Sequence, residues 1–160
     1  FYTGADDRIL EHWDVISEYV APTKSGEDMV SGPAGPSLDG QTDANKALVL
    51  EFVKQVLTEG HHDRLDQFVS AKLIQHEPRI ASRRDGLAEA LRNGLVGSYD
   101  MLFKLIGEGD LVMTFSRVYR DQGAFAVFDL YRIEDRLIAE QWSLSEPILP
   151  RDQWGNNGKF

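Results

Sequence analysis

The sequence predicts an α+β fold, in which helices cover one face of a curved antiparallel sheet. Two observations predict it. Between residues 46 and 97 apolar side chains recur mainly at helical spacing, whereas from Leu111 onwards they are β-branched or aromatic and alternate with polar ones. Helices that precede a run of consecutive strands are typical of this layered arrangement. A sheet that closes part way over such helices leaves a pocket between the two layers, which is where a ligand is expected.

The composition favours a single domain and excludes several classes of function. A chain of 160 residues suits one domain with a substantial core. The net charge of −9 argues against a nucleic-acid partner, because phosphate contacts need an excess of Lys and Arg. The chain has no cysteine, which excludes disulfides and thiol nucleophiles, and no apolar run of about 20 residues that could span a membrane. These features predict a cytoplasmic protein.

Residues 1–20 are predicted to form a hairpin that repeats a later part of the chain. The chain begins at Phe1 without a Met, and residues 1–14 align without gaps on residues 130–143. The aligned positions that are identical are Tyr2/Tyr131, Asp6/Asp135, Ile9/Ile138, Glu11/Glu140 and Trp13/Trp142. We expect a tandem duplication, with residues 1–20 as the last hairpin of a preceding repeat in a longer protein. Chance similarity between two hairpins is the alternative.

Residues 21–43 are predicted to be a linker, because Gly and Pro interrupt any periodicity there. A first helix is expected from Lys46 to Thr58, ending near Gly60, and a short second helix from 63 to 69. A third helix is expected from Ser82 to about residue 97, since leucines recur at a spacing of four. Residues 70–76, between the second and third helices, are predicted to be extended.

The second half of the chain predicts strands at 101–106, 111–119, 124–133 and 137–144, and the last three form a meander. In the strand 124–133, Asp129 shares its face with apolar and aromatic residues. Burying a carboxylate among such neighbours raises its pKa, as a general base near neutral pH requires. The alternative is a structural carboxylate that pairs with Arg117 or Arg132 and has a lowered pKa.

Five segments together resemble the SnoaL-like polyketide cyclases of the nuclear-transport-factor-2-like superfamily. They are Asn45 to Leu57, Leu73 to Pro78, Gly109 to Val112, Asp129 to Asp135, and Glu140 to Trp142. The resembling domain covers residues 44–150, and residues 151–160 are similar to the C-terminal extension of the family. The resemblance implies a cone-shaped sheet wrapped around three N-terminal helices, with a cavity between them, and a homodimer. It also implies aldol-type cyclisation of a small apolar carbonyl compound without cofactor or metal.

The functional residues of the family carry over only in part. The resemblance implies Asp129 as acid/base, with His76 as a second catalytic residue. The alternative for His76, which follows an extended segment and lies close to Pro78, is a structural hydrogen-bonding residue. Phe115 stands where many members have a His. The family's Glu-His-Trp-Asp motif has become Glu140-Gln141-Trp142-Ser143, and is intact only at Glu11-His12-Trp13-Asp14. His12 and Asp14 lie two apart, so on a strand they share a face and could complete the pocket of a neighbouring subunit through strand exchange.

The wall of the ligand pocket is predicted from aromatic residues with one amide. These candidates are Phe103, Phe115, Tyr119, Tyr131, Gln141 and Trp142. Aromatic side chains at alternating spacing are equally typical of an ordinary core. His61 and His62 are expected in a solvated loop rather than at a metal. For the function as a whole, two alternatives stay open: a degenerate domain that only binds a ligand or dimerises, and an isomerase or dehydratase acting on a steroid-like ketone.

Overall fold

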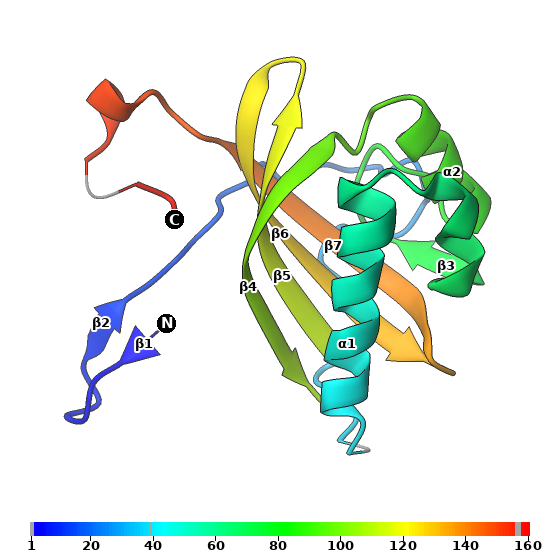
Figure 1. The fold of residues 1–160 in the computed structure, drawn as a ribbon, viewed down its shortest axis with the longest axis horizontal. Helices are drawn as coiled ribbons and strands as arrows, with labels where there is room; N and C mark the ends of the chain where they lie inside the picture. Colours follow the sequence, from blue (N-terminus) through cyan, green and yellow to red (C-terminus); the bar gives the residue numbers. More distant parts are fainter. Residues whose placement is uncertain (1, 39, 156–157) are drawn as a thin grey trace.

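The computed structural model describes residues 2–38, 40–155 and 158–160. Phe1 of the predicted hairpin, Asp39 of the predicted linker, and Asn156 and Asn157 of the predicted tail lie outside the described residues. The chain forms a curved five-stranded sheet with helices packed on its inner face, and a separate two-stranded hairpin (Figure 1). The predicted α+β fold class is therefore confirmed.

Four antiparallel strands form a meander, and a fifth strand extends it. The meander consists of β4 (Ser98–Glu108), β5 (Leu111–Arg120), β6 (Gly123–Glu134) and β7 (Leu137–Pro147), and β3 (Val69–Gln75) runs parallel to β7 at one edge. The sequence predicted the strands but not the parallel pair. Val69 is paired with Ile138, and the two lie 138 − 69 = 69 residues apart in the sequence. No turn between adjacent strands therefore indicates this pairing.

The helices follow the predicted order. They are α1 (Thr42–Phe52), which continues directly as a π-helix, η1 (Val53–Thr58), then the 3₁₀ helix η2 (His62–Gln67) and α2 (Arg84–Arg92). Helix α1 lies along the inner face of the sheet (Figure 1). Its Phe52 meets the ring of Tyr131 edge-on at 5.8 Å, which joins the helical layer to the middle of the sheet.

Strand alternation divides the sheet side chains between two faces. On β6 the odd-numbered residues from Phe125 to Ile133 point inward, towards the helices, and the even-numbered ones point outward. The hydrophobic core lies between the inner face and the helices. It includes Val49, Phe52, Val56, Leu73, Leu87, Val112, Val118, Val127, Tyr131 and Ile138.

The N-terminal segment begins with a hairpin and then lies against the outer face of the sheet. Strands β1 (Tyr2–Thr3) and β2 (Ile9–Glu11) pair with each other, and this hairpin stands away from the five-stranded sheet (Figure 1). The chain then crosses the outer face, where Lys104 lies 4.0 Å from the ring of Trp13 and the Trp142 indole donates to the carbonyl of Ser31. None of the described helices is long and apolar enough to cross a membrane.

Candidate acid–base site

Asp129 lies at the centre of the inner face of the sheet. It is paired with Thr114 on β5 and Ser143 on β7, and its side chain has no exposed surface. Tyr99, on β4, donates its hydroxyl to Oδ2 of Asp129 at 2.7 Å. The neighbouring strands therefore add hydroxyl groups to the apolar and aromatic side chains that share the face of Asp129 on its own strand.

Five buried polar atoms have no hydrogen-bond partner within the described part of the chain, and all five lie on this face. They are Thr114 Oγ1, Ser116 Oγ, Arg120 Nε, Asp129 Oδ1 and Tyr131 Oη. Each belongs to β5 or β6, at positions that the register and the alternation of the strands place on the inner side. Tyr131 also interacts with Thr114 and Asp129, so these groups lie close to one another. Buried polar groups without a well-formed hydrogen bond are rare, and their concentration on one face makes this face the candidate site.

Burial dominates the electrostatics of the site. It raises the pKa of the Asp129 carboxyl group above the usual range, while Ser143, Tyr99 and the charge of Arg120 act in the opposite direction. Burial, and then the charge of Asp129, raises the pKa of Tyr99 and of Tyr131 well above that of a free phenol. Both phenols therefore stay protonated near neutral pH and remain hydrogen-bond donors.

His76 and Trp142 lie on the opposite face of the sheet from Asp129. The imidazole of His76 contacts the Asp28 carbonyl oxygen through Nδ1 and Glu140 Oε1 through Nε2, the latter at 2.8 Å. The ring of Trp142 stacks on it with a centroid distance of 4.6 Å. The structure therefore does not bring the two predicted catalytic residues together, and His76 instead holds the linker against the sheet.

The predicted pocket wall is also divided between the two faces. Only Tyr131 and Gln141 share the inner face with Asp129, whereas Phe103, Phe115 and Tyr119 lie on the outer face. Phe115 is fully buried there and stacks on Phe128 at 4.3 Å. The physical reason is register: Thr114, and not Phe115, is paired with Asp129, and a difference of one residue moves a side chain to the other face.

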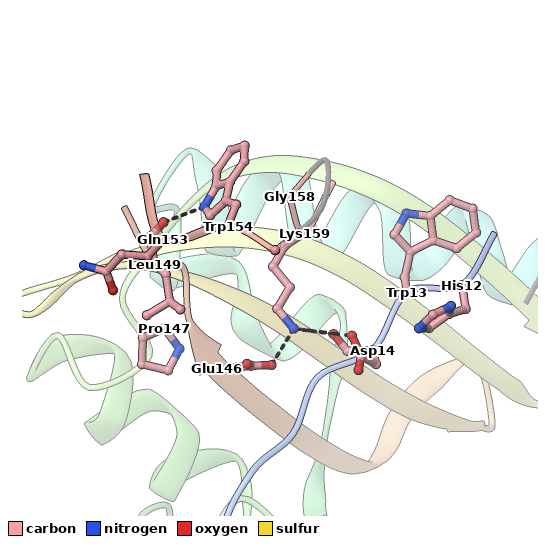
Figure 2. Close-up of a pocket in the computed structure, with 11 residues that line it drawn as sticks. His12, Trp13, Asp14, Glu146, Pro147, Leu149, Gln153, Trp154, Gly158 and Lys159 are labelled. Atoms are coloured by element: carbon pink, nitrogen blue, oxygen red, sulfur yellow. Dashed lines mark hydrogen bonds and ion pairs between the residues drawn. The ribbon is translucent and has the colours of Figure 1, made fainter. Parts of the chain in front are cut away.

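The outer face has clefts of its own. An apolar cleft of about 430 Å³ lies between residues 29–33 and the sheet, and Trp142 lines it. A smaller pocket of about 250 Å³ lies between the N-terminal segment and the C-terminal tail (Figure 2). There Lys159 Nζ contacts Glu146 at 2.7 Å and Asp14 at 3.3 Å, and His12 also lines the pocket. His12 and Asp14 thus lie near their own chain's outer face, and their part in a neighbouring subunit stays a prediction.

Several residues of the candidate site were missed in the sequence. Tyr99, Ser116 and Arg120 carry no motif, and only the pairing of β4 with β5 and of β5 with β6 places them near Asp129. A signal was present in the alternation Thr114, Ser116, Val118, Arg120, which is polar where a buried strand face is normally apolar. Within the described ranges, no group of three His, Cys, Asp or Glu residues is placed to hold a metal ion.

Comparison with known proteins shows the fold. No protein-family model and no curated protein matches the sequence. Among solved structures, an NTF2-like protein of unknown function from Mesorhizobium loti matches with a TM-score of 0.57 and 16% identity, over 68% of this chain and 96% of that one. A candidate ketosteroid isomerase from Kribbella flavida matches with a TM-score of 0.59 and 10% identity, over 73% and 91%. A candidate polyketide cyclase from Acidithiobacillus ferrooxidans matches with a TM-score of 0.53 and 14% identity, over 64% and 87%.

Proposed function

We propose, from the premise that this chain has the fold of the nuclear-transport-factor-2-like superfamily, that the inner face of its sheet is an acid–base site for a small carbonyl compound. The observation that carries the proposal is the fully buried carboxyl group of Asp129 beside the hydroxyl of Tyr131, on neighbouring inward positions of β6. Asp129 Oδ1 and Tyr131 Oη each lack a hydrogen bond of normal geometry, although the two side chains interact with each other. One is a base and the other a donor. Cyclases and isomerases among proteins of the same fold support this assignment. The predicted cytoplasmic location is compatible with it.

In the proposed reaction, Asp129 Oδ1 takes a proton from a carbon next to a carbonyl group. The electron pair of that C–H bond moves into an enolate, whose oxygen accepts a hydrogen bond from Tyr131. The enolate carbon then forms a bond to a second carbonyl carbon of the same molecule, and the resulting alkoxide takes up the proton from Asp129. Tyr99 holds the other carboxyl oxygen, so that Oδ1 is presented to the substrate.

The raised pKa of Asp129 fits this role. A carboxylate with an ordinary pKa is too weak a base to remove a proton from carbon efficiently, and burial brings its basicity closer to what the step demands. The same groups could return the proton to a different carbon, which is isomerisation. Product analysis separates the two reactions, since only the aldol reaction forms a carbon–carbon bond.

The second candidate function is non-catalytic. Full burial of Asp129 and its bond to Tyr99 favour this candidate, because both are also what a structural network requires. In that case the domain binds a ligand in an outer cleft or serves as a dimerisation partner. The catalytic proposal requires instead that the inner face open to a substrate, since Asp129 has no exposed surface.

Exchange of α-protons with D₂O tests the proposal without knowledge of the natural substrate. A panel of ketones is incubated with wild-type protein, Asp129→Asn and the control Asp121→Asn, and proton loss is followed by NMR. Asp121 is exposed in the turn between β5 and β6, away from the inner face. We expect exchange with the wild type and the control, and a loss of at least about 100-fold for Asp129→Asn. Equal exchange by all three proteins would refute Asp129 as the base.

A further inference from the structure

We propose that Arg120 and Ser116 form an anion-binding subsite beside Asp129, and that the substrate is therefore a keto acid whose carboxylate binds there. This inference rests on the proposed acid–base site and names its substrate class. It replaces the apolar carbonyl compound expected from the sequence by a charged one.

The position of the Arg120 side chain carries the first step. Arg120 is the last residue of β5 and lies on the inner face, with its guanidinium 4.8 Å from the centroid of the Phe125 ring. Its Nη1 donates to Ser145 Oγ at 2.9 Å. Ser145 is paired with Val127, whose partner on the other side is Ser116. Through this contact the guanidinium group lies at the level of Ser116, Val127 and Ser145, which are paired across β5, β6 and β7.

The second step is the imbalance between donors and acceptors. Two of the unpartnered donors are the Nε of Arg120 and the hydroxyl of Ser116. The hydroxyls of Thr114 and Tyr131 can donate as well, but these two groups also interact with each other. Among the buried carboxylate oxygens of the described residues, only Asp129 Oδ1 is unpartnered, and the proposed reaction uses it as a base. A ligand that satisfies this set must bring several acceptor oxygens, as a molecule with a carboxylate and a ketone does.

The third step is charge. Arg79 is itself paired through Nε with Glu77 at 2.6 Å, which leaves no carboxylate within salt-bridge distance of Arg120 among the described residues. Burial lowers the pKa of Arg120 and repulsion from Arg79 lowers it further, whereas Tyr99, Asp129 and Glu77 act in the opposite direction without offsetting the decrease. An anion bound beside Arg120 would add to the second group of effects. A carboxylate also suits the planar guanidinium, which donates through two parallel N–H groups.

The distance along β5 between Ser116, at the proposed subsite, and Thr114, which is paired with Asp129, limits the length of the ligand. Ser116 and Thr114 lie two residues apart on β5, which corresponds to about 7 Å along a strand. A hydrogen bond between guanidinium and carboxylate takes up about 3 Å of that distance. The enolisable carbon that faces Asp129 should therefore be one or two carbons away from the carboxylate. 4-Oxopentanoate has this geometry.

Binding of 4-oxopentanoate and of its methyl ester tests the subsite, because the two compounds share the ketone and differ in charge. Dissociation constants are measured by NMR titration for the wild type, Arg120→Gln and the control Arg117→Gln, which pairs with Asp100 on the outer face. We expect the wild type and the control to bind the acid about tenfold more tightly than the ester. Arg120→Gln should lose this preference. Equal affinity of the wild type for both compounds, or an undiminished preference in Arg120→Gln, would overturn the inference.

The same samples in D₂O separate this inference from the proposed function. Selective binding of the acid without α-proton exchange would support the subsite and refute Asp129 as a base. Exchange of both compounds at the same rate, with equal affinities, would support the base and refute the subsite. If Arg120→Gln does not fold, Ser145→Ala replaces it, since loss of the Nη1 contact should weaken binding of the acid and leave binding of the ester unchanged.

Discussion

At the scale of single residues, the chemistry of this protein depends on which neighbours the register gives to Asp129. Its own strand offers apolar and aromatic side chains, as the sequence indicates, but β5 and β7 contribute Thr114 and Ser143. Tyr99 donates to the same carboxyl group, although it is paired with Val118 and not with Thr114, the partner of Asp129. The result is a carboxyl group that is fully desolvated and yet has polar neighbours on several sides.

The raised pKa of Asp129 should make the stability of the protein depend on pH. Between the ordinary carboxyl pKa, about 4, and the raised value, the folded protein binds this proton more readily than the unfolded chain does. The stabilisation by Asp129 is therefore fully present below the ordinary pKa, and is lost as pH rises through the raised pKa.

Urea unfolding at a series of pH values measures this effect. In Asp129→Asn the decrease across that window should be absent, so the difference in unfolding free energy between the two proteins should change steadily with pH. Asp121→Asn should follow the wild type, because its side chain is exposed. A difference between wild type and Asp129→Asn that does not change with pH would contradict the assignment of a raised pKa.

The sequence alone identified Asp129 and Tyr131, because both lie on one strand and their alternation is visible locally. It could not identify Tyr99 or Arg120, whose proximity depends on strand pairings across the sheet. The predicted use of Phe115 follows from an alignment position, and the actual pairing partner of Asp129 is the residue before it. The sequence also could not show that His76 and Asp129 lie on opposite faces, because the side of the sheet that His76 takes depends on its contacts with Glu140 and Trp142 of β7.

At the scale of elements, the linker is held at defined points along the outer face. His76 and Trp142 both contact it, the first through the Asp28 carbonyl and the second through the Ser31 carbonyl. Glu140, which contacts His76 through Oε1, also accepts a hydrogen bond from Arg132 Nε at 2.7 Å. The contact between His76 and Glu140 is therefore part of a network that includes a charged pair. The predicted linker is thus ordered at these points by side chains of β7 and of the residue that follows β3.

Replacement of His76 by Ala should release this part of the linker and destabilise the fold. Loss of a buried hydrogen-bond partner costs about 1–3 kcal/mol; here Glu140 Oε1 loses its contact with His76, while Oε2 keeps its contact with Arg132. Thermal or urea unfolding measures the loss, and limited proteolysis after Lys24 should become faster. The control is His61→Ala, whose contact with Glu59 at 3.5 Å is solvent-exposed and should leave both readouts unchanged. Equal effects of the two substitutions would contradict a clamping role for His76.

Gly109, in the turn between β4 and β5, is a second point of attachment. Its φ is +57°, and an added Cβ would lie 2.1 Å from the carbonyl oxygen of Ser37. Gly109→Ala should cost about 2–3 kcal/mol in unfolding free energy, from both backbone strain and loss of the contact with the linker. Gly60→Ala is the matched control, because its φ is +76° but nothing lies within 4 Å. It should cost about 1 kcal/mol, and an equal cost at both sites would argue against close packing of the linker at Gly109.

Most elements were predictable from the chain itself. The helical spacing of apolar residues and the β-branched runs gave the order of helices and strands. Periodicity does not reveal the parallel pairing of β3 with β7, or that a π-helix continues α1, because neither changes the local pattern of apolar residues. It also does not say which side of the sheet the linker takes. That depends on contacts such as Trp142 with Ser31, between residues 111 positions apart.

At the scale of the whole molecule, the hairpin β1–β2 is the least enclosed part of the described chain. Ile9 and Leu10 are 58% and 60% exposed, and this sheet has only two strands. Isolated hairpins are marginally stable in water, and exposed apolar side chains on them favour association. The homodimer stays a prediction, and the exposed hairpin is the part of the chain at which it can be tested.

Light scattering at micromolar concentration tests the dimer. We expect a mass near twice the 18.0 kDa of one chain. Leu10→Asp should shift the population towards the monomer, since a charge at an apolar contact disfavours association. Leu38→Asp is the control, because Leu38 is 74% exposed but lies in the linker. A monomeric wild type at all concentrations would contradict the prediction, and equal effects of the two variants would exclude the hairpin as the contact.

The parallel pairing of β3 with β7 has a consequence for the order of folding. The meander β4 to β7 is built from neighbouring strands and can form early, whereas β3 must wait for a partner that is synthesised 69 residues later. Asp129 has its Ser143 neighbour only once β7 has joined the sheet. Burial raises the pKa of Asp129, whereas the contact with Ser143 lowers it. The unusual basicity of this residue is therefore acquired only when the finished meander has packed against the helices, and not when β7 pairs with β6.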